Sequence, residues 1–296
     1  MIRVLSVGLC GSDAHWLEEG GIGDAVIPEN GVIPGHEFCG VVESGTRAGE
    51  RVAIDPAIPC LRCDECLAGR LNLCLEMRFS GHGTTEGALR SHLVWPERCL
   101  VPLPDNVTDE QGSLLEPLGI ALHAIDLGDV QGTTAVAVLG CGPVGLLLIA
   151  ALRARGISPI AADPLEHRMA AAERMGARVD GDPTAGVVDV VFDCAGNDDS
   201  LHTALRMARP GGRVVLVGVP EGDRTTFQAS LARRKEISLL SCRRMLPHDL
   251  ERAADLVGEG SVSLDGLITH RFPLAEAGTA FQTLVARSGL KVIIQP

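Results

Sequence analysis

The sequence predicts an α/β protein with two domains, a β-rich domain and a parallel sheet that helices cover on both faces. Two patterns support this prediction. Residues 1–118 hold short β-like runs separated by Gly and Pro, whereas residues 135–240 alternate apolar runs with helix-like stretches. The chain has 296 residues, 46% hydrophobic and 22% charged, which is an ordinary balance for a globular protein.

The β-rich domain is expected to cover residues 1–118 and to be completed by the C-terminal end, from about 260 to 296. Its strands are predicted at residues 2–9, 39–45, 51–55, 91–95 and 99–104. Short strands with frequent turn residues are typical of a barrel-like unit. Near the end of the chain, residues 272–289 predict a helix and residues 290–295 predict a strand.

The domain between these parts is expected to cover residues 119–259. Its strands are predicted at residues 135–140, 158–163, 188–194 and 212–219, and helix-like stretches connect them. Continuous Val, Ile and Leu runs joined by helices are typical of a doubly wound parallel sheet.

Composition excludes several classes of function. The chain has 38 acidic and 26 basic residues, a formal net charge of −12, so we expect no nucleic-acid partner. It lacks an apolar run of about 18 residues, so we expect no membrane partner. The N-terminus has no signal-peptide pattern, and we therefore expect a cytoplasmic protein. Tyrosine is absent, which excludes mechanisms that use a catalytic tyrosine.

A glycine-rich turn between a strand and a helix predicts a dinucleotide site. Residues 140–145, GCGPVG, have the pattern GxGxxG, and they end one apolar run and open a helix-like stretch. Gly140 permits the tight turn, Gly142 lets the backbone approach a pyrophosphate, and Gly145 allows the helix to pack closely on the strand. Val144 belongs to the same predicted site, where the helix N-terminus offers free N–H groups to phosphates. This context predicts a Rossmann fold.

An acidic residue is expected about 20 residues after the first glycine, at the end of the next strand. Asp163 occupies this place, 23 positions after Gly140. Its carboxylate would accept hydrogen bonds from the ribose hydroxyls and would repel a 2′-phosphate, which favours NAD over NADP. Arg168 follows one helical turn later and is expected to pack on the adenine. The alternative is a plain turn in which Asp163 caps the next helix.

Four cysteines within fifteen residues predict a structural zinc site. Cys60, Cys63, Cys66 and Cys74 have the spacing C-x2-C-x2-C-x7-C, which allows four sulfurs to form a tetrahedron around one ion. An iron–sulfur cluster is a weaker interpretation, because ferredoxin motifs close with a shorter gap and a following Pro. Free or disulfide-bonded thiols are the remaining alternative, and disulfides are rare in the cytosol.

Three further segments carry residues that are able to bind a second zinc ion. These residues are Cys10 in GLCGSDAH, His36 and Glu37 in IPGHEFCG, and Glu116 in LLEPLG. Each alone has an ordinary explanation as a core thiol, a loop histidine or a solvated carboxylate. Gly or Pro flanks each segment, however, and such turns let the backbone fold closely around a metal.

With these segments, and with GGIGD and THRFPL, the sequence resembles the zinc-dependent medium-chain alcohol dehydrogenase superfamily. The polyol (sorbitol- and xylitol-like) and threonine dehydrogenases are the most similar branch. The resemblance extends over nearly the whole chain and implies a GroES-like catalytic domain with a Rossmann domain. It further implies NAD and two zinc ions per subunit, one catalytic and one structural. A homodimer or homotetramer is expected, with residues 236–241 as an exposed edge strand.

The resemblance also implies roles for individual residues. Cys10, His36 and Glu37 would hold the catalytic zinc, with Glu116 as an exchanging or water-mediated partner. Ser12 and His15 would form the proton relay. The implied reaction moves a hydride from a secondary alcohol, polyol or hydroxy-amino acid to NAD⁺ and gives a ketone.

Two departures from the family pattern bear on these expectations. Family members usually carry one or two strands before the segment that begins here at Met1, so we expect an open edge in the β-rich domain. Trp16 stands where polyol enzymes often carry Tyr, and it is expected to line the substrate pocket. A shortened, non-catalytic relative that binds zinc and a dinucleotide is therefore the alternative function. A zinc-free quinone reductase is disfavoured, because such proteins lack the four-cysteine lobe and the His36–Glu37 pair.

Overall fold

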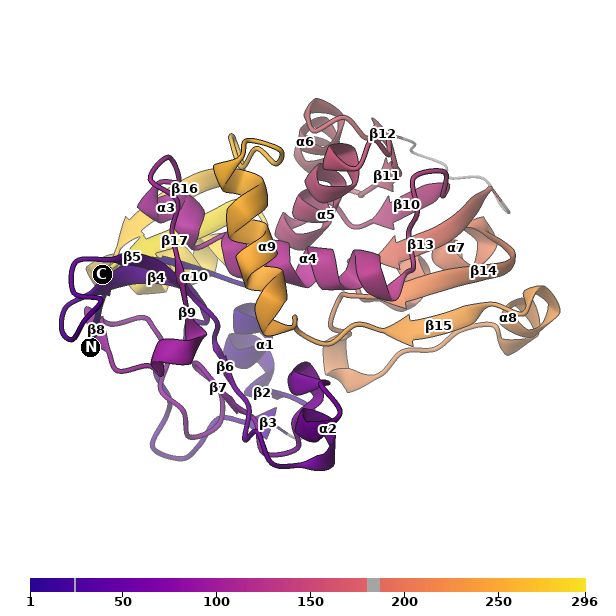
Figure 1. Cartoon of the computed structure of the whole chain (residues 1–296). Coiled ribbons are helices and arrows are strands. Elements are labelled where there is room, and N and C mark those ends of the chain that lie inside the picture. The colour runs from indigo at the N-terminus through magenta and orange to yellow at the C-terminus, as the bar shows by residue number, and fades with distance from the viewer. Residues whose placement is uncertain (24, 180–186) are drawn as a thin grey trace. The chain divides into compact units, whose positions relative to one another are not determined.

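The computed structural model describes residues 1–23, 25–179 and 187–296 (Figure 1). They divide into two compact units, one made of Met1–Gly119 with Met245–Pro296 and the other of Ile120–Arg244. The chain returns to the first unit at Met245, earlier than the expected return near residue 260. The reason is helix α9 (Pro247–Gly258), which packs on strand β9 (Leu100–Pro102) of the first unit.

The first unit contains a mainly antiparallel sheet. Within the described residues this sheet has seven strands in the order β16-β17-β1-β4-β5-β9, and β8 pairs with β1 as a branch. Besides β9, the strands are β1 (Ile2–Gly8), β4 (Glu37–Val42), β5 (Arg51–Ile54), β8 (His92–Leu93), β16 (Ile268–Pro273) and β17 (Lys291–Gln295). Only the β16–β17 pair among these is parallel. The C-terminal strands thus complete the sheet beside β1, the first strand of the chain.

Strand β1 lies inside this sheet and not at its edge, because β17 and β4 pair with its two sides. The edge strands of the main path are β16 and β9. The first strand of the chain is therefore not an edge strand of this sheet.

Smaller elements connect and cover this sheet. They are α1 (Gly11–Glu19), β2 (Gly21–Ile22), β3 (Ala25–Val26), β6 (Ala57–Ile58), α2 (Asp64–Leu67), the 3₁₀ helix η1 (Leu71–Leu73), β7 (Arg78–Phe79), η2 (Glu97–Cys99), α3 (Asp109–Gly112), η4 (Leu274–Glu276) and α10 (Ala277–Val285). Gly20 follows the last residue of α1 as its C-cap, and its left-handed backbone (φ +76°) favours glycine. Asp24, the last residue of the GGIGD segment, lies outside the described residues.

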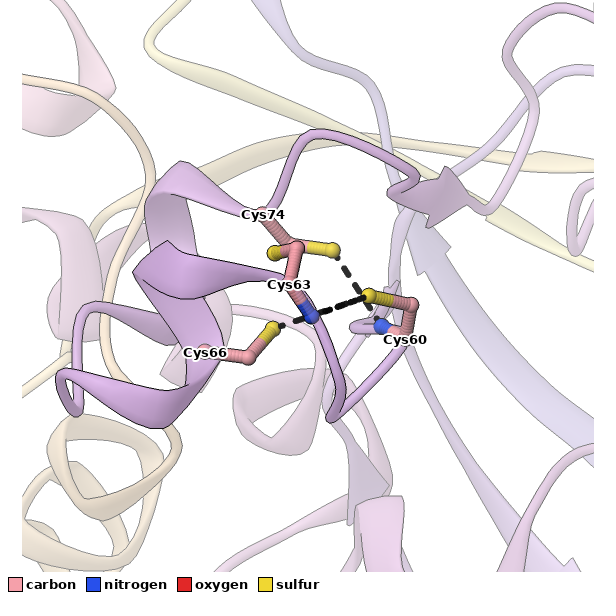
Figure 2. A group of neighbouring side chains, drawn as sticks. All are labelled: Cys60, Cys63, Cys66 and Cys74. Atoms are coloured by element: carbon pink, nitrogen blue, oxygen red, sulfur yellow. Dashed lines mark hydrogen bonds between the residues drawn. The ribbon is translucent and has the colours of Figure 1, made fainter.

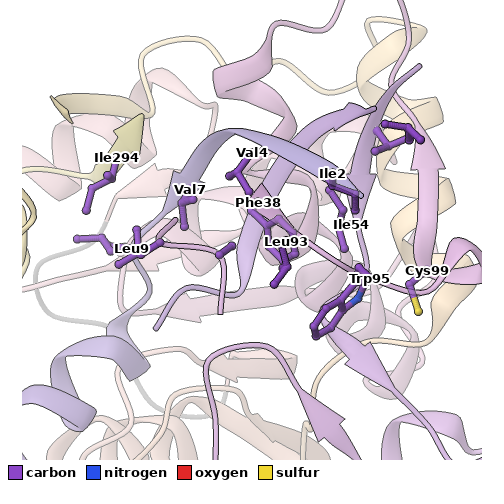
Figure 3. Close-up of a cluster of buried hydrophobic side chains, with 14 of the residues drawn as sticks. Ile2, Val4, Val7, Leu9, Phe38, Ile54, Leu93, Trp95, Cys99 and Ile294 are labelled. Carbon is purple, nitrogen blue, oxygen red and sulfur yellow. The ribbon is translucent and has the colours of Figure 1, made fainter. Parts of the chain in front are cut away.

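The core of the first unit collects apolar side chains from strands that are distant in sequence (Figure 3). Val4 and Val7 of β1 share it with Phe38 of β4, Ile54 of β5 and Ile294 of β17. Burial of such side chains stabilises the sheet by about 1.5–3 kcal/mol each relative to exposure. This core therefore fixes the register of the strands that carry the candidate site residues.

The second unit contains a parallel sheet. Among the residues described, its strands run in the order β12-β11-β10-β13-β14-β15, and every pair is parallel. They are β10 (Val136–Leu139), β11 (Ile160–Ala162), β12 (Arg178–Val179), β13 (Val188–Asp193), β14 (Ala208–Leu216) and β15 (Ser238–Ser241). In chain order this is 3-2-1-4-5-6, the arrangement of dinucleotide-binding domains. The predicted doubly wound sheet is confirmed, and the predicted edge strand is β15.

The described helices of this unit precede or connect its strands along the chain. They are α4 (Leu115–Leu127), which begins in the first unit, α5 (Pro143–Ala154), α6 (Glu166–Arg174), α7 (Asp198–Met207), the 3₁₀ helix η3 (Glu221–Asp223) and α8 (Ala229–Lys235). Helices α5 and α6 pack on each other, as do α7 and α8. Side chains of α7 are buried against β13 and β14 in the core of this unit. The described helices include none that is long and apolar enough to cross a membrane.

Candidate functional site

Four cysteine side chains meet in the lobe formed by residues 60–74 (Figure 2). The sulfur atoms of Cys60, Cys63, Cys66 and Cys74 all lie within 4.8 Å of one another. Leu61 has a left-handed backbone (φ +61°), uncommon for leucine, which turns the chain sharply between the first two cysteines. The short helix α2 begins after Cys63 and carries Cys66 on its single turn. The predicted convergence of the four thiols is therefore present.

Backbone N–H groups of this lobe point at the sulfur atoms. Cys60 N–H donates to Cys74 Sγ (3.2 Å) and Cys63 N–H donates to Cys60 Sγ (3.4 Å). Backbone N–H groups of Leu75 and Cys66 lower the pKa of the Cys63 thiol to about 6, whereas burial raises the pKa of the Cys66 thiol to about 12. All ten cysteines of the chain are described, and none forms a disulfide. Four thiols that already receive N–H donors fit a tetrahedral zinc ion.

A second group of possible metal ligands comes from separate segments. Cys10, His36 and Glu37 each offer one ligand atom, and these three atoms lie within 4.8 Å of one another. Glu37 begins β4, and its antiparallel pairing with β1 places it opposite Gly8, just before Cys10. Sulfur, imidazole nitrogen and carboxylate oxygen are the donors that zinc binds in proteins. Burial raises the pKa of the Cys10 thiol to about 12, and the charge of Glu37 is the second cause of this rise. Loss of the Cys10 proton near neutral pH therefore depends on a bound cation.

Asp13 supports this second group and carried no motif signal of its own. Its Oδ2 accepts the Cys10 N–H (2.8 Å), and its Oδ1 lies 3.6 Å from His36 Nδ1. His36 Nδ1 is buried and makes no hydrogen bond within the described part of the chain. A carboxylate beside one imidazole nitrogen orients the other nitrogen toward a metal. The residues present therefore fit a zinc ion held by Cys10, His36 and Glu37.

The two predicted relay residues lie on helix α1 next to this group. Ser12 Oγ is 3.4 Å from His36 Nε2 and is also hydrogen-bonded to Cys10. His15 is one turn further along the helix, where its Nδ1 lies 2.6 Å from Glu19 Oε1. The structure therefore brings Ser12 to the ligand group and holds His15 against Glu19.

Glu116 is buried near the beginning of α4 but does not join the ligand group. Burial raises its pKa well above the usual value, and the charges of Glu37 and Cys10 raise it further. His36 and Lys291 lower the same pKa. Glu116 thus lies within electrostatic reach of the candidate ligands, consistent with the outer role expected from the resemblance.

An aromatic cluster lies beside His36 and was only partly expected. The Trp16 indole Nε1–H donates to His82 Nε2 (3.2 Å), and the His82 ring lies 4.8 Å from the rings of Trp16 and Phe79. The His36 ring is 5.4 Å from both His82 and Phe79. His82 has no sequence spacing that indicates a site, and only the folding of its loop brings it to this place.

Lys291 was also missed by the sequence analysis. It begins the apolar strand β17 and is only 1% exposed. Its ammonium group donates to the Leu9 carbonyl (2.9 Å) and forms an ion pair with Glu37 Oε2. In the pattern KVIIQ this lysine stands at the end of an apolar strand, and nothing in the local sequence connects it with Glu37.

The predicted dinucleotide turn has the expected backbone. Gly140 has a left-handed φ of +90°, and a Cβ there would lie 2.7 Å from the backbone nitrogen of Ala195. A Cβ at Gly145 would collide with the Gly140 carbonyl. At Gly142 the nearest atom to a Cβ is the Arg168 guanidinium at 3.6 Å, so the space above this glycine is open. Helix α5 begins after Gly142, and Val144 lies in its first turn. The turn fits a pyrophosphate.

Asp163 and Arg168 lie together beside this turn. Asp163 Oδ2 accepts the Cys141 N–H (2.8 Å), and its Oδ1 accepts the Leu165 N–H (2.9 Å). Arg168 Nη1 is 3.8 Å from Asp163 Oδ2, and Arg168 Nε is buried without a partner among the residues described. Asp163 does not cap α6, because the N-cap of this helix is Leu165 and no described side chain caps it. The two backbone contacts of Asp163 instead fix its carboxylate at the end of β11.

Comparison with known proteins decides the family. Residues 1–105 match the family described as alcohol dehydrogenase GroES-like domain, and residues 143–259 match the family described as zinc-binding dehydrogenase. "Probable D-xylulose reductase A" of Neosartorya fischeri is 35% identical over 99% of this chain and 88% of its own length. The chain belongs to the zinc-dependent medium-chain alcohol and polyol dehydrogenases.

Two solved structures of this superfamily have the same fold. L-Idonate 5-dehydrogenase of Escherichia coli has a TM-score of 0.92 and 27% identity, with 100% of this chain and 90% of that chain covered. A zinc-binding dehydrogenase of Sinorhizobium meliloti bound to NADP has a TM-score of 0.89 and 31% identity, with 100% and 91% covered. These findings confirm the GroES-like and Rossmann domains.

Membership of this superfamily makes the chain an oxidoreductase that uses zinc and a nicotinamide dinucleotide on an alcohol or polyol. The alternative of a non-catalytic relative is not favoured, because the similar proteins are named reductases and dehydrogenases. The roles of the individual residues, the choice between NAD and NADP, and the oligomeric state remain predictions.

Proposed function

We propose that this dehydrogenase oxidises a secondary alcohol group of a polyol or hydroxy-amino acid to a ketone, with NAD⁺ as the hydride acceptor. The observation that carries the proposal is the convergence of Cys10, His36 and Glu37 ligand atoms, with the Ser12 hydroxyl 3.4 Å from His36 Nε2. A metal ligand set next to a proton acceptor is what the oxidation of an alcohol requires.

The zinc ion and the side chains of the protein would contribute different parts of the reaction. Zinc, when bound, supplies a Lewis acid that makes a substrate hydroxyl more acidic. Ser12 is placed to accept the hydroxyl proton at Oγ. His15, held by Glu19 at the half-buried side of α1, passes a proton toward solvent. Glu116, outside the ligand group, orients water or exchanges with a ligand.

The choice of NAD over NADP rests on Asp163. Its carboxylate is fixed by two backbone N–H groups at the end of β11, where an adenosine ribose binds in this fold. A 2′-phosphate would bring negative charge next to this carboxylate. The guanidinium group of Arg168 lies close enough to Asp163 to balance part of the negative charge of the carboxylate. The structure of the Sinorhizobium meliloti protein with NADP shows that another member of the superfamily accepts the 2′-phosphate.

Steady-state kinetics with purified zinc-loaded protein tests the proposal. We expect reduction of NAD⁺ with at least one substrate from a panel of polyols, threonine and 2,3-butanediol, and two zinc ions per chain. Ser12→Ala should lower kcat by about 10²–10⁴-fold, the usual effect of losing a general base. Asp163→Ser should reduce the preference for NAD⁺ over NADP⁺. Protein with two zinc ions and no NAD⁺ reduction on the whole panel would contradict the proposal.

The proposal extends to a homodimer or homotetramer in the cytoplasm. The parallel sheet of the second unit ends at β15, and an edge strand of this kind can continue into the same strand of a second copy. Ten cysteines without a disulfide suit a reducing compartment. Light scattering coupled to size-exclusion chromatography measures the mass that decides the first point.

A further inference from the structure

Lys291 carries a buried ammonium group in the sheet of the first unit, on strand β17 next to β1. The Cα partner of Gly8 is Ile293 on one side and Glu37 on the other, so β1 lies between the strands that carry Lys291 and Glu37. Both side chains are 1% exposed. The ammonium group contacts Glu37 Oε2 and donates to the Leu9 carbonyl (2.9 Å).

Gly8 provides the space in which this pair meets. A Cβ at position 8 would collide with Glu37 Oε2 and would lie 2.8 Å from Lys291 Cε. The backbone φ of Gly8 is not in the left-handed region, so conformation alone does not require glycine here. Its role is to leave room for the ion pair over β1.

The charge of Lys291 reaches the acidic groups around the candidate metal site. It lowers the pKa of Cys10, Asp13 and Glu116, while burial raises each of these pKa values. Burying several acidic groups together is unfavourable unless cations compensate them. Lys291 supplies one such cation as part of the fold, independent of any metal.

We propose that Lys291 is a positioning residue of the metal centre, a fixed counter-cation that holds one oxygen of Glu37 and competes with the metal ion for this carboxylate. The inference rests on the proposed function, which assigns a metal to Cys10, His36 and Glu37. Without the metal, the ammonium group compensates Glu37 and keeps its side chain in place. With the metal bound, two cations share one carboxylate and repel each other, so Glu37 is a weak and exchangeable ligand.

This competition predicts opposite effects on the metal-free and the metal-loaded protein. Removal of Lys291 leaves Glu37 buried without its partner, which destabilises the metal-free protein. It also removes a positive charge close to the metal, which strengthens metal binding. A unit charge at about 4–6 Å changes proton affinity by about 10–1000-fold, so we expect zinc to bind the second site at least tenfold more tightly.

The experiment measures thermal unfolding and zinc affinity of the full chain, with zinc removed by a chelator and then restored. Lys291→Met should lower the unfolding temperature of the zinc-free protein and increase the rise that Zn²⁺ produces. Lys291→Arg keeps the charge and should restore wild-type behaviour. In Co²⁺-substituted Lys291→Met, the visible absorption of the ion should change, because Glu37 becomes a stronger ligand.

The chain offers a matched control in Lys235, its other lysine. Lys235 Nζ donates to the carbonyls of Leu205, Arg206 and Ala208 in the second unit. Lys235→Met also removes a hydrogen-bonded ammonium group, but it should leave the zinc affinity of both sites unchanged. The four-cysteine site serves as an internal control, because it should take up restored zinc with the same affinity in every variant.

A double variant keeps the test valid if Lys291→Met folds poorly. Glu37→Gln combined with Lys291→Met removes both partners, so the zinc-free protein should regain stability relative to the single variant. Unchanged or weaker zinc binding in Lys291→Met would overturn the inference. A wild-type protein that holds zinc only at the four cysteines would instead overturn the proposed function on which the inference rests.

Discussion

The two candidate metal sites of this dehydrogenase are built in different ways. The cysteine lobe draws all its ligands from residues 60–74, and its geometry follows from local turns, with left-handed backbone at Leu61 and Gly69 and the single turn of α2 between them. The second site joins Cys10 to His36 and Glu37, and Glu37 pairs with Lys291, 254 positions away. One site therefore depends on local turns, whereas the other exists only after β1, β4 and β17 have paired in register.

The two sites also differ in the charges around the ligands. In the lobe, backbone N–H groups donate to sulfur, so neutral dipoles stabilise the thiolates. At the second site the neighbours are charged: Asp13 lies near His36, and Lys291 contacts Glu37. A structural ion needs a closed and static set of ligands, whereas a catalytic ion needs a position that substrate can reach. These differences predict that one substitution can remove the zinc ion of one site and leave the zinc ion of the other site bound.

The largest effect is expected from loss of a ligand at the second site. Cys10→Ser should remove one zinc ion and lower kcat/KM at least about a thousandfold, since metal-ion catalysis supplies several kcal/mol and about 1.4 kcal/mol is tenfold in rate. The lobe zinc should stay, because none of its ligands changes. Kinetics and zinc analysis by mass spectrometry measure both quantities. Two zinc ions with full activity would show that Cys10 is not a ligand.

The opposite pattern is expected when the lobe is disabled. Cys66→Ser removes a buried thiol from the four-cysteine group and should lower the free energy of unfolding by about 4 kcal/mol or more, as loss of a bound metal does. The folded fraction should still turn over substrate at low temperature. Thermal unfolding and zinc content measure the change, with Cys242→Ser in the second unit as a control that keeps both ions. Loss of kcat without loss of stability would refute the division of roles.

The sequence allowed one of these sites to be predicted more completely than the other. The spacing of the four cysteines and the GCGPVG turn are local, so a short segment contains the whole signal. Asp13, His82 and Lys291 carry no such signal, because only the register of the sheet and the fold of a loop bring them to the site. The same limit applies to α9, because a local sequence pattern does not tell which unit a helix packs on.

A moderate effect is expected at Asp13, which acts on the second site only. Asp13→Asn keeps the size of the side chain but removes the charge that lies 3.6 Å from His36 Nδ1. Loss of such an outer partner typically lowers metal affinity or activity by about 10–100-fold. Zinc competition with a chelator measures the affinity of each site. Glu18→Gln removes a charge from the exposed side of the same helix and should have no effect. An equal loss at the lobe would indicate general unfolding.

The smallest effect is expected in the aromatic cluster, in which the rings of His82 and Phe79 lie 5.4 Å from the His36 ring. Trp16→Phe keeps an aromatic ring but removes the indole N–H that donates to His82. A neutral hydrogen bond contributes about 0.5–1.5 kcal/mol, so we expect changes in KM of up to about tenfold, larger for some substrates than for others, with kcat nearly constant. Both zinc ions should remain, because neither Trp16 nor His82 is a proposed ligand. KM values measured for polyols of increasing length test this, and a uniform loss of kcat would instead place His82 in the chemistry of the metal site.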